Sequence, residues 1–328
     1  MSKKMRKVIL SYAVVLLLLV GMFLVSAQMG SLKLTLPQLF RGLFVQYDPN
    51  VATVFDLRFP RILIAMLAGA AVAVSGVLLQ AVLKNPLADP GIIGVSSGAG
   101  LMAVCVSVFL PSCYFLTPLF ACAGGMAAFF LVYVLSWKGG LSPLRIILTG
   151  VAMDAFFSSA AKAINALTGG ERHGVASVVE GNITQKTWED VRLLMPYVAV
   201  GLILAFLSRK SCNLLQLEDK TARGLGINVN RSRICISFIA VILASISTAV
   251  VGSISFLGLI VPHMGRLLVG SDHKKLIPFS AILGAFIFLA ADTVGRMIAM
   301  PYEVKASIIM SIFGGPLFII LLRKSKKN

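Results

Sequence analysis

Apolar residues along this chain gather into ten long runs that are separated by shorter polar segments. Most runs have 18 or more residues, which is enough for an α-helix to cross roughly 30 Å of hydrocarbon. The pattern predicts an all-α polytopic membrane protein with ten transmembrane helices, in which residues 1–328 form a single transmembrane domain. The expected spans are 8–27, 59–83, 93–110, 115–137, 143–167, 193–208, 234–252, 254–269, 276–297 and 305–322.

One polar stretch interrupts this pattern, and the apolar run before it has an unusual helix face. "KNPLADPGIIGVSSGAG", residues 84–100, puts prolines and glycines between two apolar runs, so we expect a turn there rather than a continuous helix. In the run before it, Ala65, Gly69 and Ala73 recur every four positions and are followed by Gly76. Small residues at this spacing let helices approach closely, and we favour bundle packing over a pore-lining role for them.

The composition supports a membrane location. Of the 328 residues, 58% are hydrophobic and 13% are charged, and the mean hydropathy is +0.91. Soluble domains carry about 25% charged residues, so the density of charge here is about half the usual value.

The net charge of +17 is best explained by topology. In a soluble chain it would suggest nucleic acid, but here the basic residues cluster at both chain ends and in the polar segment 209–233. An even number of spans puts both termini on one side. With the termini inside, and with residues near the span ends counted to the side they adjoin, the inner side holds 19 of the 30 lysines and arginines and the outer side holds nine. The positive-inside rule therefore predicts cytoplasmic termini.

The sequence offers little catalytic chemistry. It has no G-x-x-x-x-G-K-[ST] loop for phosphates, no Ser/His/Asp arrangement and no pair of carboxylates that would suggest hydrolysis. The five cysteines do not have metal-ligand spacing. We expect no enzyme activity, no metal site and no cofactor.

Charged residues inside the spans are few, which limits how the protein could be powered. They are Asp154, Lys162, Arg266, Asp292 and Arg296. Asp292 and Arg296 are four residues apart and can pair on one helix. Only Asp154 remains as a candidate ion-coupling acid, which argues against self-powered transport.

Energy would then come from a partner, and the segment 209–233 is polar enough to contact one. Its first half is expected to form short helices broken at Gly224 and Gly226. Three alternatives remain open from the residues alone: an ion-gradient-driven carrier, a membrane scaffold that transports nothing, and a solvated basic loop at 209–233.

Four ordered blocks carry a family resemblance. They are "RFPRILIAMLAGAAVAVSGVLLQAVLKNPLADPGIIGVSSGAG" (58–100), "NLLQLEDKTARGLGINVNRSR" (213–233), "GSISFLGLIVPHMGRLLVGSDHKKLIPFSAILGAFIFLAADTVGR" (252–296) and "GGPLFIILL" (314–322). Over nearly its whole length the chain resembles the FecCD-type permeases of ABC importers, which move ferric siderophores, haem or cobalamin.

The resemblance implies a multi-pass permease in the cytoplasmic membrane that works with several partners. These are a second permease copy or a paralogue, two cytosolic ATPase subunits and an extracytoplasmic substrate-binding protein. The overall likeness favours an iron complex, either haem or a ferric siderophore, with cobalamin as the alternative substrate. Among iron complexes we lean towards haem.

The resemblance also assigns roles to individual residues. The segment 209–233 would couple to the ATPases, and Asp292 would hold Arg296 in place. The residues that match the family pattern are, for ATPase coupling, Asp219, Ala222, Arg223 and Gly226; for the cytoplasmic gate, Asn85, Leu87, Ser142 and Pro143; and for docking of the binding protein, Arg58, Arg61 and Arg296.

The sequence departs from the family pattern at a few places. In "PYEVKAS", Lys305 stands where the family has a second proline and Ser307 where it has glycine. Val178 replaces a frequent tryptophan in the outer segment that keeps Trp188, and Glu218 replaces a glycine in the coupling segment. The outer departures affect the expected shape of the platform for the binding protein.

Overall fold

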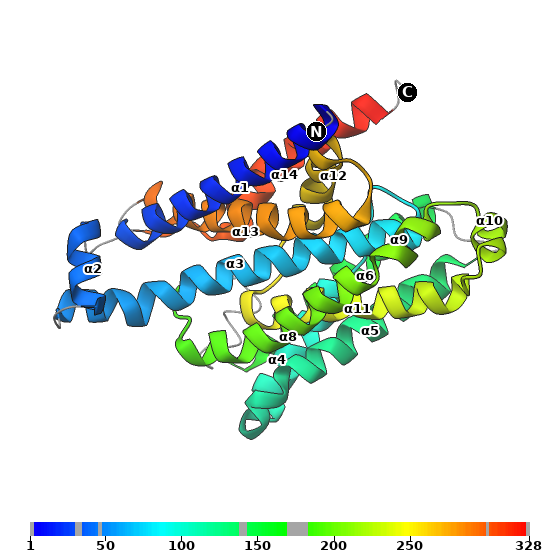
Figure 1. Ribbon diagram of the computed structural model, residues 1–328. Coiled ribbons are helices and arrows are strands. Elements are labelled where there is room, and N and C mark those ends of the chain that lie inside the picture. The colour runs from blue at the N-terminus through cyan, green and yellow to red at the C-terminus, as the bar shows by residue number, and fades with distance from the viewer. Residues whose placement is uncertain are drawn as a thin grey trace.

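A computed structural model describes residues 3–29, 35–44, 48–137, 143–168, 183–299 and 302–325, and its elements are helices (Figure 1). They are α1 (Lys3–Gln28), α2 (Leu36–Phe44), α3 (Pro49–Leu83), α4 (Val95–Phe109), the 3₁₀-helix η1 (Pro111–Leu116), α5 (Thr117–Ser136), α6 (Pro143–Leu167), α8 (Trp188–Leu207), α9 (Arg209–Leu215), α10 (Asp219–Gly224), α11 (Val229–Val251), α12 (Leu257–Val269), α13 (His273–Met297) and α14 (Ala306–Ser325).

Helix α3 is the centre of the bundle. It lies between one group formed by α1, α12, α13 and α14 and another formed by α4, α5, α6, α8 and α11 (Figure 1). Its 35 residues would span roughly 50 Å at 1.5 Å per residue, which exceeds the thickness of a bilayer core. Its two ends therefore reach different surfaces of the protein.

The start of α3 is ten residues earlier than the predicted span, which begins at residue 59. Asp48 is the N-cap, and its carboxylate accepts hydrogen bonds from the backbone N–H groups of Asn50 (2.8 Å) and Val51 (3.4 Å). Pro49 follows at the first helical position, where its missing N–H costs nothing. Hydropathy did not include residues 49–58 in the span, because Asp56 and Arg58 make this part of the helix more polar.

Small residues let α3 approach its neighbours at backbone distance. A Cβ atom at Gly69 would collide with the backbone of Gly284 in α13, and one at Gly76 would collide with the backbone of Gly258 in α12. Bundle packing by this small-residue face, which the sequence predicted, is therefore confirmed.

Each of the ten predicted spans coincides with a helix. Within the described ranges, seven helices are long and apolar enough to cross a membrane: α1, α3, α5, α6, α8, α11 and α13. Helices α4 and α12 and the described apolar part of α14 are apolar but shorter. The count of ten spans therefore stays a prediction.

Contacts between distant segments define two ends of the bundle. At one end, the Tyr12 hydroxyl donates to the carbonyl of Lys275 (2.6 Å), and Asn213 of α9 donates to Asp272 (2.8 Å). The start of α1 and the end of α14 lie at this end in Figure 1. At the other end, Trp188 at the start of α8 donates to the carbonyl of Phe55 (3.2 Å).

Candidate functional site

A buried ion pair joins α3 to α13 at the end of the bundle that holds the start of α3. The Arg61 guanidinium donates from Nε (3.0 Å) and Nη2 (2.8 Å) to Oδ1 of Asp292. Asp292 is 1% exposed and Arg61 is 7% exposed. A buried charge is tolerated when a well-placed opposite charge and hydrogen bonds compensate for its lost hydration, and both are present here.

Arg296 completes this pairing. Its Nε lies 3.3 Å from Oδ2 of Asp292, which confirms the pairing predicted from their spacing of four residues. Its Nη2 also donates to Ser26 at the end of α1, and Arg296 is 7% exposed. One carboxylate thus holds two arginines from different helices.

The three arginines expected to dock a binding protein lie at this same end. Arg58 lies one turn before Arg61 on α3, and its Nη1 donates to the carbonyl of Ala27 (3.1 Å). Arg58 is half-buried, so it is more accessible than Arg61 and Arg296.

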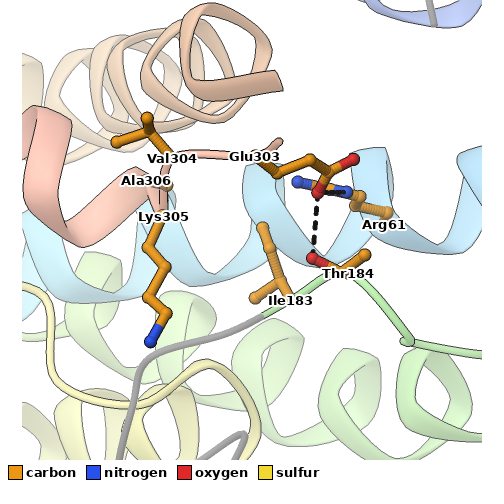
Figure 2. A pocket seen from close by; sticks show the side chains of 7 residues that line it. All are labelled: Arg61, Ile183, Thr184, Glu303, Val304, Lys305 and Ala306. Atoms are coloured by element: carbon orange, nitrogen blue, oxygen red, sulfur yellow. Dashed lines mark hydrogen bonds and ion pairs between the residues drawn. The ribbon is translucent and has the colours of Figure 1, made fainter. Parts of the chain in front are cut away.

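Glu303 lies at the rim of this cluster and also binds Arg61. Its Oε2 accepts a hydrogen bond from Nη1 of Arg61 (2.8 Å) and another from the Thr184 hydroxyl (3.0 Å) (Figure 2). The Glu303 side chain is 37% exposed, and partial burial alone would raise its pKa. The bonds and charge of Arg61 outweigh that effect and lower the pKa of Glu303 below its ordinary value. We call Arg61, Asp292, Arg296 and Glu303 the Arg61 cluster.

A second charged cluster joins the other end of α3 to the segment 209–233. Lys84 Nζ donates to Oδ1 of Asp219 (2.8 Å) and to the carbonyl of Leu217 (2.5 Å). Arg233 Nη2 donates to the same Asp219 oxygen (2.9 Å). The hydrogen bond from Lys84, followed by the charge of Arg233, lowers the pKa of Asp219. We call Lys84, Asp219 and Arg233 the Asp219 cluster.

The side chains of the Asp219 cluster remain about a third exposed, at 33% for Lys84, 38% for Asp219 and 31% for Arg233. Water therefore screens their attraction, and such pairs contribute little to stability. The cluster is suited to a contact that forms and breaks rather than to a permanent brace.

The other residues predicted to couple to an ATPase also lie in or beside α10. The expected short helices are confirmed as α9 and α10, and α10 ends at Gly224. Ala222 is fully buried, so it fixes α10 on the bundle and does not present a surface. Arg223 is exposed, and Gly226 has a φ of 86°, a conformation that favours glycine.

The turn expected within residues 84–100 is confirmed: it occupies residues 84–94, between the end of α3 and the start of α4. Lys84 has a left-handed φ of 49° at the end of α3. Asn85 is buried, and its side-chain oxygen accepts a hydrogen bond from the backbone N–H of Leu87 (3.0 Å). The residue Leu87 is half-buried. Ser142 lies outside the described residues. Pro143 is the first residue of α6, and its side chain is not described.

Two residues in and beside this turn were missed by sequence reasoning. Gln80 donates to the carbonyls of Ala88 (3.2 Å) and Gly258 (3.1 Å), and it accepts from Arg266 (2.5 Å). It thus connects the turn to α12. Asp89 is fully buried and accepts from the backbone N–H of Gly91 (2.8 Å). The signal that was available for Asp89 was its position before Pro-Gly, where aspartate often stabilises a turn.

The geometry brings charged side chains to both ends of one central helix. Within the described ranges, no three His, Cys, Asp or Glu side chains are close enough to hold a metal ion. The arrangement is that of a helical membrane protein whose polar contacts are concentrated at two surfaces.

Comparisons with known proteins agree with this picture. The chain is 39% identical over 328 residues to the "Probable heme-iron transport system permease protein IsdF" of Staphylococcus aureus strain Newman, covering 100% of this chain and 99% of that protein. It also matches a solved structure described as an inward-facing conformation of a metal-chelate type ABC transporter. That match has 30% identity and a TM-score of 0.79, over 95% of this chain and 98% of the other.

Two further comparisons concern the fold and the family. The structure of PsaBC from Streptococcus pneumoniae in complex with Fab matches 87% of this chain and 95% of its own, with 17% identity and a TM-score of 0.58, which supports the fold alone. The model of the FecCD transport family matches residues 16–324. That match covers nearly the whole chain, including both charged clusters and the turn between α3 and α4, so this multi-pass membrane protein belongs to the FecCD transport family.

Proposed function

We propose that this chain is the membrane-spanning permease of an ABC importer that takes up an iron complex. It would pair with a second copy or a paralogue, receive energy from two cytosolic ATPase subunits and receive substrate from an extracytoplasmic binding protein. Family membership supports this function over the ion-gradient-driven carrier.

The observation that carries the proposal is the bond between Lys84 and Asp219. Asp219 starts α10 in the expected coupling segment, and Lys84 directly precedes Asn85 of the expected gate. A movement of α10 would therefore reach the gate through the Lys84 side chain, whose Nζ lies 2.8 Å from Oδ1 of Asp219 and 2.5 Å from the carbonyl oxygen of Leu217. Arg223 and Leu225 are exposed beside it and offer a surface that an ATPase could contact.

The mechanism follows from this connection. ATP binding draws the two ATPases together and shifts the segment 209–233. Lys84 follows Asp219, and the turn that begins at Asn85 changes its position. Asn85 and Leu87, with Ser142 and Pro143 on the neighbouring loop, form the cytoplasmic gate in this proposal, and ATP hydrolysis resets it.

The opposite end of the bundle would face the extracytoplasmic side. Arg58, Arg61 and Arg296 would receive acidic side chains of the binding protein there, since a guanidinium pairs with a carboxylate through two parallel hydrogen bonds. Asp292 keeps Arg61 and Arg296 in place. This orientation puts both chain termini in the cytoplasm, in line with the distribution of basic residues.

Haem is the substrate that we test first, because the Staphylococcus aureus relative is named a probable heme-iron transport system permease. Ferric siderophores are the second choice and cobalamin the third. In this proposal the binding protein selects the substrate, so the same permease could serve more than one iron complex.

Reconstitution tests this function directly. The permease, its ATPase and its binding protein are placed in proteoliposomes, and uptake of labelled haem, ferric hydroxamate, ferric catecholate and cobalamin is measured. We expect uptake of an iron complex that requires ATP and survives collapse of ion gradients. Uptake that depends on an ion gradient and not on ATP would contradict the proposal.

Growth of a strain that lacks the gene gives the matching physiological result. Loss of growth on a single iron complex would name the substrate.

A further inference from the structure

The cavity beside Arg61 has the lining of a carboxylate site. Its walls come from α3, from the start of α14 with the residues before it, and from the segment that holds Ile183 and Thr184 (Figure 2). Its volume is about 150 Å³. At about 30 Å³ per water molecule this is room for about five waters, enough for the tip of an acidic side chain. Arg61, Thr184 and Lys305 line it together with one acid, Glu303.

Within the Arg61 guanidinium, the two groups of N–H donors have different partners. Nε and Nη2 are bound to Asp292, which is almost completely buried, so that edge is fixed. Nη1 reaches the cavity side and donates to Glu303. A new partner could therefore replace Glu303 without breaking the buried pair.

Glu303 is held in a way that lets its carboxylate leave. The neighbouring backbone is anchored, because the Val304 N–H donates to the carbonyl of Gly295 (2.9 Å). The side chain itself is more than a third exposed, so water already reaches its carboxylate. Water that reaches the Glu303 side weakens the pair, and Arg61 keeps its bonds to Asp292 when Glu303 leaves, so the release leaves no unpaired buried charge.

We propose that Glu303 is the resident carboxylate of an exchange site, where an acidic side chain of the binding protein replaces it on Nη1 of Arg61 and on the Thr184 hydroxyl. The inference rests on the proposed docking role of this end, and it names the group that the partner displaces. Because one carboxylate replaces another, the number of charge-assisted hydrogen bonds stays the same. Docking then remains readily reversible, and a basic side chain is rejected by Arg61.

The test removes the resident charge. The complete permease–ATPase complex in nanodiscs is titrated with substrate-loaded binding protein, comparing the native chain with Glu303→Gln. Glutamine keeps the size of the side chain but competes poorly for Arg61, so we expect the Kd to fall about three- to tenfold. Thr184→Val removes the same hydrogen bond from Glu303 and from the carboxylate that replaces it, so the Kd should stay within twofold of the native value.

A matched control separates exchange from general electrostatics. Glu189 lies at the start of α8, near the same end, and is exposed. Glu189→Gln removes the same charge without touching Arg61, so it should leave the Kd within twofold of the native value.

A second probe makes the result independent of the binding protein. The peptide acetyl-Gly-Glu-Gly-amide and its glutamine counterpart are compared by saturation-transfer difference NMR on the same nanodiscs. The glutamate peptide should bind Glu303→Gln several-fold more tightly than the native chain, and the glutamine peptide should not discriminate.

The outcomes distinguish the two proposals. If Glu303→Gln changes neither the peptide signal nor the Kd while the native complex still docks and transports, the exchange site is overturned and the importer function stands. If the peptide exchanges but the Kd of the binding protein does not change, the binding protein is not the occupant. If no binding protein docks on the native complex or stimulates it, the proposed function fails, and the peptide arm alone decides on the exchange site.

Discussion

The Arg61 cluster and the Asp219 cluster both connect α3 to segments far away in the sequence, but they do so in different surroundings. Asp292 at the centre of the first is 1% exposed, whereas Asp219 at the centre of the second is 38% exposed. A buried carboxylate that holds two arginines cannot lose a partner cheaply, because an unpaired charge would remain away from water. An exposed carboxylate can, because water solvates it whenever a partner leaves. The first cluster is thus suited to fix a surface and the second to transmit a movement.

The largest expected effect comes from breaking the buried cluster. Asp292→Asn leaves Arg61 and Arg296 without their shared negative charge, and removing one partner of a buried ion pair typically costs about 3–5 kcal/mol. We expect a strongly reduced apparent Tm in detergent and little folded protein. Asp56→Asn is the control, because Asp56 is an exposed acid near the same end of α3, and its Tm should stay near the native value. Equal Tm values for the two variants would mean that burial does not set the difference.

The next effect concerns function rather than stability. Asp219→Arg puts a third cation beside Lys84 and Arg233, so α10 should lose its contact with the end of α3. We expect at least a tenfold loss of uptake and of substrate-stimulated ATP hydrolysis in proteoliposomes, with almost no change in Tm. Glu218→Arg is the matched control, since Glu218 is the adjacent exposed acid and is not part of the cluster. Full activity of Asp219→Arg would remove the coupling role.

Lys84→Asn isolates the connection to the gate. Asparagine tolerates the left-handed conformation that position 84 requires, so the backbone at the end of α3 should keep its course. The variant loses only the contacts of the lysine ammonium with Asp219 and Leu217. Uptake should fall about three- to tenfold while the ATPase still binds the permease, measured by co-purification. Unchanged uptake would mean that α10 reaches the gate by another route.

The helices of this protein could be predicted from its sequence, because each span must hydrogen-bond its own backbone and present apolar side chains to lipid. The pairing of Asp292 with Arg296 was also predictable, since residues four apart on a helix share a face. The turn after α3 was visible from its prolines and glycines. These features all depend on neighbours in the sequence.

The long-range charge pairs could not be predicted in the same way. Arg61 and Asp292 are 231 positions apart, and Lys84 and Asp219 are 135 apart. A single sequence contains no information on which of several acids each cation meets. Family motifs marked Arg61 and Asp219 as docking and coupling residues, but Glu303 was noted only within a motif that departs from the pattern. Its role beside Arg61 needs the three-dimensional arrangement.

Ionic strength should separate the two clusters with a smaller effect. The Debye length falls from about 10 Å at 0.1 M salt to about 3 Å at 1 M, which screens exposed pairs far more than buried ones. We expect that raising the salt inside the proteoliposomes from 0.1 to 0.5 M lowers the number of substrate molecules transported per ATP hydrolysed about two- to threefold. The Tm should stay nearly constant, and Lys84→Asn should be insensitive to salt. A parallel loss of Tm would show that the buried cluster is screened as well.

The smallest expected effect is that of pH, because both exposed acids are held in their charged form. Arg61 keeps the pKa of Glu303 below its ordinary 4.5, and Lys84 keeps that of Asp219 below its ordinary 3.8. An acid whose pKa is lowered in the folded state keeps its pairing above its ordinary pKa and loses it only as the pH falls through the lowered value. Between pH 8 and pH 5 both pairs should therefore persist, and acidification alone should not release Glu303 from Arg61. The ratio of the Kd of the native chain to that of Glu303→Gln, measured with the same binding protein at each pH, cancels titration of the binding protein itself and should stay constant. A ratio that falls towards one with a midpoint between pH 5 and pH 7 would mean that Glu303 titrates in the physiological range, and the contrast between a fixed buried acid and an exchangeable exposed one would then have to include protonation.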